Sequence, residues 1–284
     1  MSLRNATMQQ KDEALATALA KVDQCRTLAE SRSADALHDL IDSLMEVNKA
    51  LLSLDRRGES LEWSEQAVTL CRALEQEHPG KGAARLALLL NYQSTLLCSE
   101  GREEEALVLE TESVRLLRGL KEKAPEKFLS FLAQGVLSLG MTQGKLGRAE
   151  ESLALLREAV GLYRELARQD PEDGGQELVD ALSTLSDQLK ELGRKEEALV
   201  TNQEHVDLLR ALAERNPERF LGGLGISVEL LGELRLELGH KAEGVALLEE
   251  AVRLYQQKTT ERQQQSKLTA LKRVQARLDA LRSA

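Results

Sequence analysis

A repeat period of 46 residues is the feature that most limits how this chain can fold. All four prolines of the chain stand on that step: Pro79, Pro125, Pro171 and Pro217. Four glycines keep the same step: Gly101, Gly147, Gly193 and Gly239. Self-similarity with a period of roughly 20 to 50 residues is typical of chains built from stacked units, in which each unit contacts mainly its neighbours. The sequence therefore predicts one elongated series of like units.

Each unit has the apolar spacing of two helices. After Pro125, apolar residues return at steps of three, four and seven: Leu132, Val136, Leu139 and Leu146. A second run follows Gly147: Leu153, Leu156, Val160 and Tyr163. The glycine between the runs suits a helix C-cap, and the proline closing each unit suits the first turn of the next helix. We therefore expect an all-α fold, an α-solenoid of antiparallel helix hairpins with about 12 helices.

Small residues recur where the two helices of a hairpin have to approach closely. In the first helices they are Asn48, Ser94, Gly140, Ser186 and Gly232, and in the second helices Ser60, Ala106, Ser152, Ala198 and Gly244. This pattern resembles the tetratricopeptide repeat, and Leu139-Gly140, Ser152, Leu156 and Ala159 match it residue by residue. Units of 46 residues instead of about 34, with few aromatic anchors, are similar to the long repeats of kinesin light chains and bacterial signalling proteins. The resemblance covers about residues 11–261 and implies a protein-binding scaffold.

The period also predicts the domain boundaries. Residues 1–10 carry no pattern and are expected to be disordered or an expression tag, and 11–33 match a second helix without its partner. Five repeats follow at 34–78, 79–124, 125–170, 171–216 and 217–262. For residues 263–284 the sequence predicts a capping helix with a basic outer side. The polar stretch at 259–266, which overlaps its start, is either a linker or a continuation of the preceding helix. A start in mid-repeat means either a cap or a chain cut from something longer.

Composition argues against several classes of protein. The formal net charge is −9, from 38 basic and 47 acidic residues, and no basic stripe follows the units, so we expect no nucleic-acid binding. No apolar run approaches 18 residues, so we expect no membrane span. Three cysteines, an odd number, argue against a disulfide framework. Cys25 and Cys71 are one period apart, which places them beyond the ~7 Å Cα separation that a bridge allows. A cytoplasmic setting is expected.

The chain offers no catalytic, metal or cofactor signature. None of the four histidines pairs with another His or Cys at metal-ligand spacing. Gly222-Gly223-Leu224-Gly225 looks like a phosphate loop, but no strand precedes it and no Lys-Ser/Thr follows it. Trp63 replaces leucines of later units and is interpreted as core. We therefore expect no enzymatic activity and no cofactor.

In a tetratricopeptide array the first helices line the concave groove, so the resemblance implies a set of partner-binding residues. That set is Leu88, Asn91, Tyr92, Thr95, Leu137, Met141, Asp180, Asp187, Glu191, Glu229, Glu233 and Glu237. It is apolar and aromatic in the second and third repeats and acidic in the fourth and fifth. We expect a peptide or protein partner with basic and apolar residues; the other interpretation is that the acids only keep the groove soluble. A carboxylate-binding cluster is incomplete, because Lys49, Asn91 and Lys145 lack an arginine.

Three functions follow from this pattern. The first is a non-catalytic interaction scaffold. The second is a regulatory or sensor segment of a larger multidomain signalling protein or enzyme. The third, an enzyme in its own right, would need a cleft with convergent polar groups, which a periodic surface does not supply. Self-association into a homodimer through the end helices also stays open.

Overall fold

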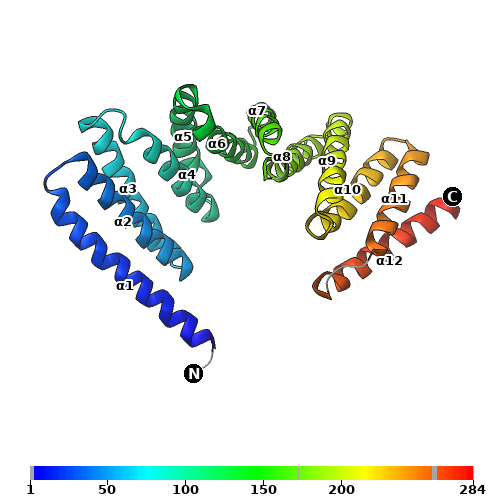
Figure 1. The fold of residues 1–284 in the computed structure, drawn as a ribbon. Coiled ribbons are helices and arrows are strands. Elements are labelled where there is room, and N and C mark those ends of the chain that lie inside the picture. The colour runs from blue at the N-terminus through cyan, green and yellow to red at the C-terminus, as the bar shows by residue number, and fades with distance from the viewer. Residues whose placement is uncertain (1–2, 172, 258–260, 284) are drawn as a thin grey trace. The chain divides into compact units, whose positions relative to one another are not determined.

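The computed structural model describes residues 3–171, 173–257 and 261–283, and within these ranges the chain consists of helices joined by short turns, without strands (Figure 1). Twelve helices are described: α1 Leu3–Ala29, α2 Ala34–Ser53, α3 Arg57–Glu77, α4 Ala83–Ser99, α5 Glu103–Lys123, α6 Pro125–Lys145, α7 Ala149–Gln169, α8 Asp173–Glu191, α9 Lys195–Arg215, α10 Pro217–Glu237, α11 Lys241–Gln256 and α12 Glu261–Ser283. From α1 to α6, and again from α7 to α12, each helix packs on the next one along the chain, as in the predicted α-solenoid.

The turn inside each hairpin is made by the periodic glycine. Gly101, Gly147, Gly193 and Gly239 all have positive φ, between 71° and 85°. In this left-handed region a Cβ is unfavourable, and glycine has none. Asp55 stands one period before Gly101 and adopts a φ of 58°, so the first hairpin makes the same turn with an aspartate. The predicted C-cap role of these glycines is confirmed.

Two of the four prolines behave as predicted, and two do not. Pro125 and Pro217 lie in the first turns of α6 and α10, where the Asn216 side chain accepts a hydrogen bond from the Arg219 amide at 3.3 Å. Pro79 and Pro171, in contrast, precede their helices, because α4 begins only at Ala83 and α8 at Asp173. Before α4, Gly80 has a φ of 84°. The Glu75 carboxylate accepts hydrogen bonds from the backbone amides of Gly80, Gly82 and Ala83.

The small positions lie where hairpin helices touch. A Cβ added to Gly244 would stand 2.6 Å from Leu236 Cγ and 2.9 Å from the Gly232 carbonyl oxygen. Ser60, Ala106 and Ala198 are fully buried at the equivalent place in other repeats. The close approach that these residue types predicted is therefore present.

The ends of the chain differ from the expectation. Of residues 1–10, for which the sequence predicts disorder or an expression tag, residues 3–10 form the start of α1, since nothing from Leu3 to Lys11 interrupts a helix and most of these residue types favour one. At the other end α11 stops at Gln256 and α12 begins at Glu261. The predicted linker or continuation falls partly on residues 258–260, which lie outside the described residues.

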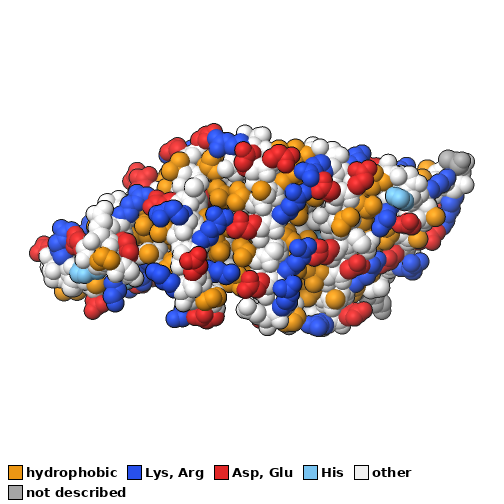
Figure 2. Space-filling view, turned by 90° about the horizontal axis from the view of Figure 1, so that it is seen from above, with side chains coloured by type: hydrophobic (Ala, Val, Ile, Leu, Met, Phe, Trp, Pro, Cys, Tyr) orange, Lys and Arg blue, Asp and Glu red, His pale blue; other side chains and the backbone are white. Residues whose placement is uncertain are grey.

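The helices divide into two compact units, which we call the N-terminal unit (residues 1–148, α1–α6) and the C-terminal unit (residues 149–284, α7–α12). Leucine, valine and alanine make up most of both cores. Ile41, Leu44 and Leu90 are fully buried in the first unit, and Val228, Leu231 and Leu248 in the second. Figure 2 shows acidic, basic and hydrophobic side chains interspersed on the face it presents.

Candidate partner-binding surfaces

In the N-terminal unit the first helices of the hairpins, α2, α4 and α6, carry partly exposed apolar side chains. Leu88 is 37% exposed and Met141 44%, while Leu137 and Tyr92 are half-buried. We call the side of each unit formed by its first helices the first-helix face. A cavity of about 360 Å³ opens there between α2 and α4, lined by Met45, Glu46, Lys49, Leu52 and Tyr92. Tyr92 is thus the residue of the predicted set that lines a hollow.

Besides Glu46 and Lys49 of α2, polar groups of α3 and α4 lie near this cavity. The Tyr92 hydroxyl lies 3.2 Å from Ser60 Oγ, and burial raises the pKa of Tyr92 above its ordinary value. Thr95 is exposed, and its hydroxyl donates to the Asn91 carbonyl oxygen. The side-chain oxygen of Asn91 is shielded from solvent and has no hydrogen-bond partner among the described residues. An acceptor of this kind can bind a donor from a partner chain.

Two acids of α2, Asp42 and Glu46, are compensated by cations. Glu46 forms an ion pair with Lys21 of α1 at 2.6 Å, and Asp42 pairs with Arg85 of α4 at 2.6 Å. The other residues that line the cavity are apolar Met45 and Leu52, with Tyr92 and the cation Lys49.

The first-helix face of the C-terminal unit is more acidic. Asp180, Asp187 and Glu191 of α8 are exposed, and Asp187 is bridged to Lys190 of the same helix at 2.6 Å. On α10, Ile226 is 55% exposed and Leu230 51%, one helical turn apart. This pair is the largest apolar contribution to the face, although the predicted set did not include it.

Two predicted acids are already occupied by the end of the chain, which corrects the sequence-based interpretation. Glu229 is only 7% exposed, receives a hydrogen bond from the Tyr255 hydroxyl at 2.7 Å and pairs with Arg273 of α12 at 2.6 Å. Glu233 is half-buried and pairs with Arg277 at 3.3 Å. The cause is that Val274 and Leu278 bury α12 against the last hairpin, which turns both arginines toward α10 instead of solvent.

Glu237 stays on the surface, about half exposed, with Lys195 at 2.9 Å. The predicted set therefore separates into three groups. Residues of α4 and α6 are largely apolar apart from Asn91 and Thr95, those of α8 are exposed acids, and the three acids of α10 all pair with cations of the chain itself.

On the opposite side the second helices are joined by arginine–glutamate pairs forty residues apart. Arg164 donates two bonds to Glu204, Arg210 pairs with Glu250 at 2.9 Å, and Arg72 pairs with Glu112 at 2.7 Å. Sequence reasoning missed this ladder, although Arg72, Arg164 and Arg210 and their partners all keep the 46-residue step.

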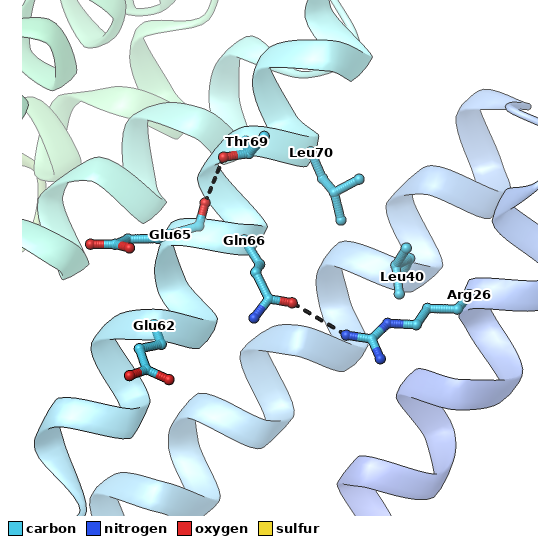
Figure 3. A pocket seen from close by; sticks show the side chains of 7 residues that line it. All are labelled: Arg26, Leu40, Glu62, Glu65, Gln66, Thr69 and Leu70. Carbon is cyan, nitrogen blue, oxygen red and sulfur yellow. Dashed lines mark hydrogen bonds between the residues drawn. The ribbon is translucent and has the colours of Figure 1, made fainter.

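The first step of the ladder is incomplete. Gln66 stands where the later repeats carry glutamate, and its side-chain oxygen receives only a 3.2 Å bond from Arg26, whose guanidinium lies 5.7 Å from the Trp63 ring centre. A shallow cavity of about 620 Å³ opens at this step between α1 and α3, with Leu40 of α2 among its lining residues (Figure 3). Trp63 is half-buried there rather than wholly in the core.

Over the described parts of the chain, no helix is both long and apolar enough to cross a membrane. In the same residues no three His, Cys, Asp or Glu side chains are grouped as metal ligands.

Comparison with solved structures adds to this geometry. BtubC (BKLC) from P. vanneervenii superposes with a TM-score of 0.63 at 16% identity, over 86% of this chain and 90% of that one. A kinesin-light-chain-type protein of Podosopora anserina with nearly identical TPR-like repeats gives 0.57 at 18% identity, over 75% of this chain and 94% of that one. The fold is a tetratricopeptide-like helical repeat. The apo form of RapI matches with a TM-score of 0.51 at 11% identity over 96% of this chain and 98% of that one. No protein-family model matches the chain, and no curated protein does.

Proposed function

We propose that this tetratricopeptide-like chain is a non-catalytic scaffold that binds a segment of another protein on its first-helix faces. The observation that carries the proposal is the exposure of large apolar side chains there: Leu88, Phe131 and Met141 in one unit, Ile226 and Leu230 in the other. Contiguous exposed apolar surface in a monomer marks a place where something binds. Methionine at such a surface adapts to varied partners. The free cysteines Cys25, Cys71 and Cys98 are consistent with a cytoplasmic location.

The C-terminal unit supports a partner with basic and apolar residues. Asp180, Asp187 and Glu191 lie exposed on α8, and Ile226 and Leu230 lie exposed on α10, the first helix of the next repeat. Apolar side chains of the partner would contact α10 while its cations approach α8. Complementary charge of this kind sets the register and the association rate more than the affinity. Glu229 and Glu233 are excluded from this role because α12 compensates them.

The test begins with crosslinking and affinity capture from the native cell, which identifies the partner and the residues that contact it. Two variants then probe the surface: Leu230→Ala removes apolar contact, and Asp187→Lys reverses the local charge. We expect each to weaken binding about fivefold or more, and Asp187→Lys to flatten the salt dependence. Glu214→Lys, an equal charge reversal on the second helix α9, is the control. Unchanged binding by both surface variants, with crosslinks confined to second helices, overturns the proposal.

Self-association through the end helices is the second candidate. Met8 and Leu28 of α1 are 57% and 61% exposed, and Leu268 of α12 is 47% exposed. These are single side chains between polar neighbours, so any association would be weak. Sedimentation over a hundredfold range of concentration distinguishes the cases, since a constant sedimentation coefficient excludes the dimer.

A further inference from the structure

Gln93 of α4 breaks the repeat at a core position. One, two and three steps away, the same place is taken by Val47, Leu139, Leu185 and Leu231, all of which are buried. Gln93 is buried as well, with 6% of its surface exposed, and its Oε1 has no hydrogen-bond partner among the described residues. Leaving a buried acceptor without a donor costs about 1–3 kcal/mol. Because no described residue donates to Gln93 Oε1, a donor from another molecule could satisfy it.

That side chain lines a cavity of about 280 Å³ on the second-helix side of the N-terminal unit, distinct from the first-helix face. Gln93 and Leu97 come from α4, Glu65 from α3, and Val108 and Leu109 from α5. Val108 is 67% exposed and Leu109 is half-buried. The walls are therefore largely aliphatic, and the buried amide lies among them.

The charge of this cavity is unbalanced toward the negative. Arg102 and Glu105 both line it, but Arg102 donates two bonds of 2.7 Å to Glu105, so their charges cancel. Glu65 is exposed and has no ion pair among the described residues. Figure 3 shows its carboxylate on the side of α3 turned away from Arg26 and Gln66. One uncompensated carboxylate and one unpaired amide oxygen thus belong to the same hollow.

We propose that this cavity binds a lysine side chain of a partner polypeptide. The alkyl stem lies on Leu97, Val108 and Leu109, as long cationic side chains do on apolar surface. The ammonium donates to the Glu65 carboxylate, and Gln93 Oε1, which is shielded from solvent in the free chain, accepts a second bond once its side chain turns toward the cavity. The Glu65 bond is charge-assisted and so the stronger of the two. This site is separate from the first-helix faces. It would give the scaffold a second surface for contact with partners.

The test is a chemical-shift titration of the full chain, isotopically labelled, with Nα-acetyl-lysine-N-methylamide at low salt. The uncharged norleucine analogue, which has a similar stem without the ammonium, is the control ligand. We expect saturable shifts of the Gln93 side-chain amide and the Val108 methyls with the lysine probe only. Equal shifts with both probes, or lysine-induced shifts confined to other residues, overturn the proposal.

Three variants separate the contributions. Glu65→Gln removes the uncompensated charge from an exposed position, and Gln93→Leu restores the residue type of the other repeats; each should weaken binding of the lysine probe roughly fivefold or more. Glu62→Gln, one turn away on α3, makes the same charge change outside the cavity and should weaken it less than twofold. Equal effects of Glu62→Gln and Glu65→Gln would show only general electrostatic attraction and contradict a built site.

Discussion

The N-terminal and C-terminal units share one hairpin but offer different surfaces. In the N-terminal unit Glu46 and Asp42 of α2 are paired with Lys21 and Arg85, and apolar Met45 and Leu52 line the cavity beside Tyr92 on the first-helix face. In the C-terminal unit the acids of α8 remain exposed, while those of α10 are paired with arginines of α12. The repeated positions build the fold in both units. The residues that depart from the repeat determine what each surface can bind.

Gly244→Ala gives the largest expected effect and tests how the second unit is held together. The new Cβ would meet Leu236 and the Gly232 backbone at under 3.0 Å, whereas Ala106 already carries a Cβ at the same place in the N-terminal unit. We expect a loss of about 2–3 kcal/mol in the free energy of unfolding, measured by urea denaturation. Gly223→Ala, with open space around its Cβ, should instead stabilise by up to about 1 kcal/mol. A Gly244 variant as stable as the parent would contradict the close approach.

Glu110 makes the stability of the N-terminal unit depend on pH. It is 2% exposed on α5, and burial raises its pKa to about 7, partly opposed by the hydroxyls of Thr142 and Ser94. Because the folded pKa is above the unfolded value of 4.5, the folded state holds the proton more tightly. Its stabilising contribution is complete below the unfolded pKa and is lost as the pH rises through about 7.

Glu110→Gln removes that titration. We expect the parent to lose about 2 kcal/mol relative to the variant between acid and mildly alkaline pH, followed by thermal unfolding in a pH series. The C-terminal unit has Asn202 at the equivalent place and offers no such group. Parallel stability profiles for parent and variant would exclude Glu110 as the cause.

Arg273→Ala tests the ion pair between Glu229 and Arg273, which joins α10 of the last repeat to α12. Without the arginine, the Glu229 carboxylate keeps only the Tyr255 hydroxyl in a place that is 7% exposed. We expect a loss of about 1–2 kcal/mol from the C-terminal unit, measured as increased hydrogen exchange in α10 and α12. The double variant Glu229→Gln with Arg273→Ala should recover part of it. Unchanged hydrogen exchange in both helices would mean that the pair contributes nothing to the packing of α12 on α10.

Gln66→Glu gives the smallest effect and completes the arginine ladder at its first step. A carboxylate there would face Arg26 as Glu250 faces Arg210. Exposed pairs contribute little, so we expect a gain of about 0.5 kcal/mol at low salt that disappears at high salt. Glu250→Gln is the reverse change in the other unit. A gain that salt does not alter would show that the effect is not electrostatic.

The period predicted the helices, their turns and their close contacts, because those properties follow from residue types that recur at fixed steps. Gly147 and Gly244 are examples, one needed for a positive φ and the other for space. The pairing of Glu229 with Arg273 could not be read in this way, since it joins a repeat to a helix outside the repeat. The helical periodicity of α10 places Ile226 and Leu230 on the first-helix face. How exposed their side chains are depends on how much of their surface the neighbouring residues cover. Gln93 was visible in the sequence as a polar residue at a repeat position that is otherwise apolar. Its proposed role could be inferred only from the cavity that it lines.

The arginines of α12 also oppose a duplication of the fifth repeat. If the fifth repeat were duplicated, Glu229 of the inner copy would face the helix that follows it, where the step of 46 puts Ser227 and Leu231 in place of Arg273 and Arg277. A carboxylate would then be enclosed without a counterion, at a cost of several kcal/mol. Tandem duplication of the fifth repeat is thus penalised at this end of the array.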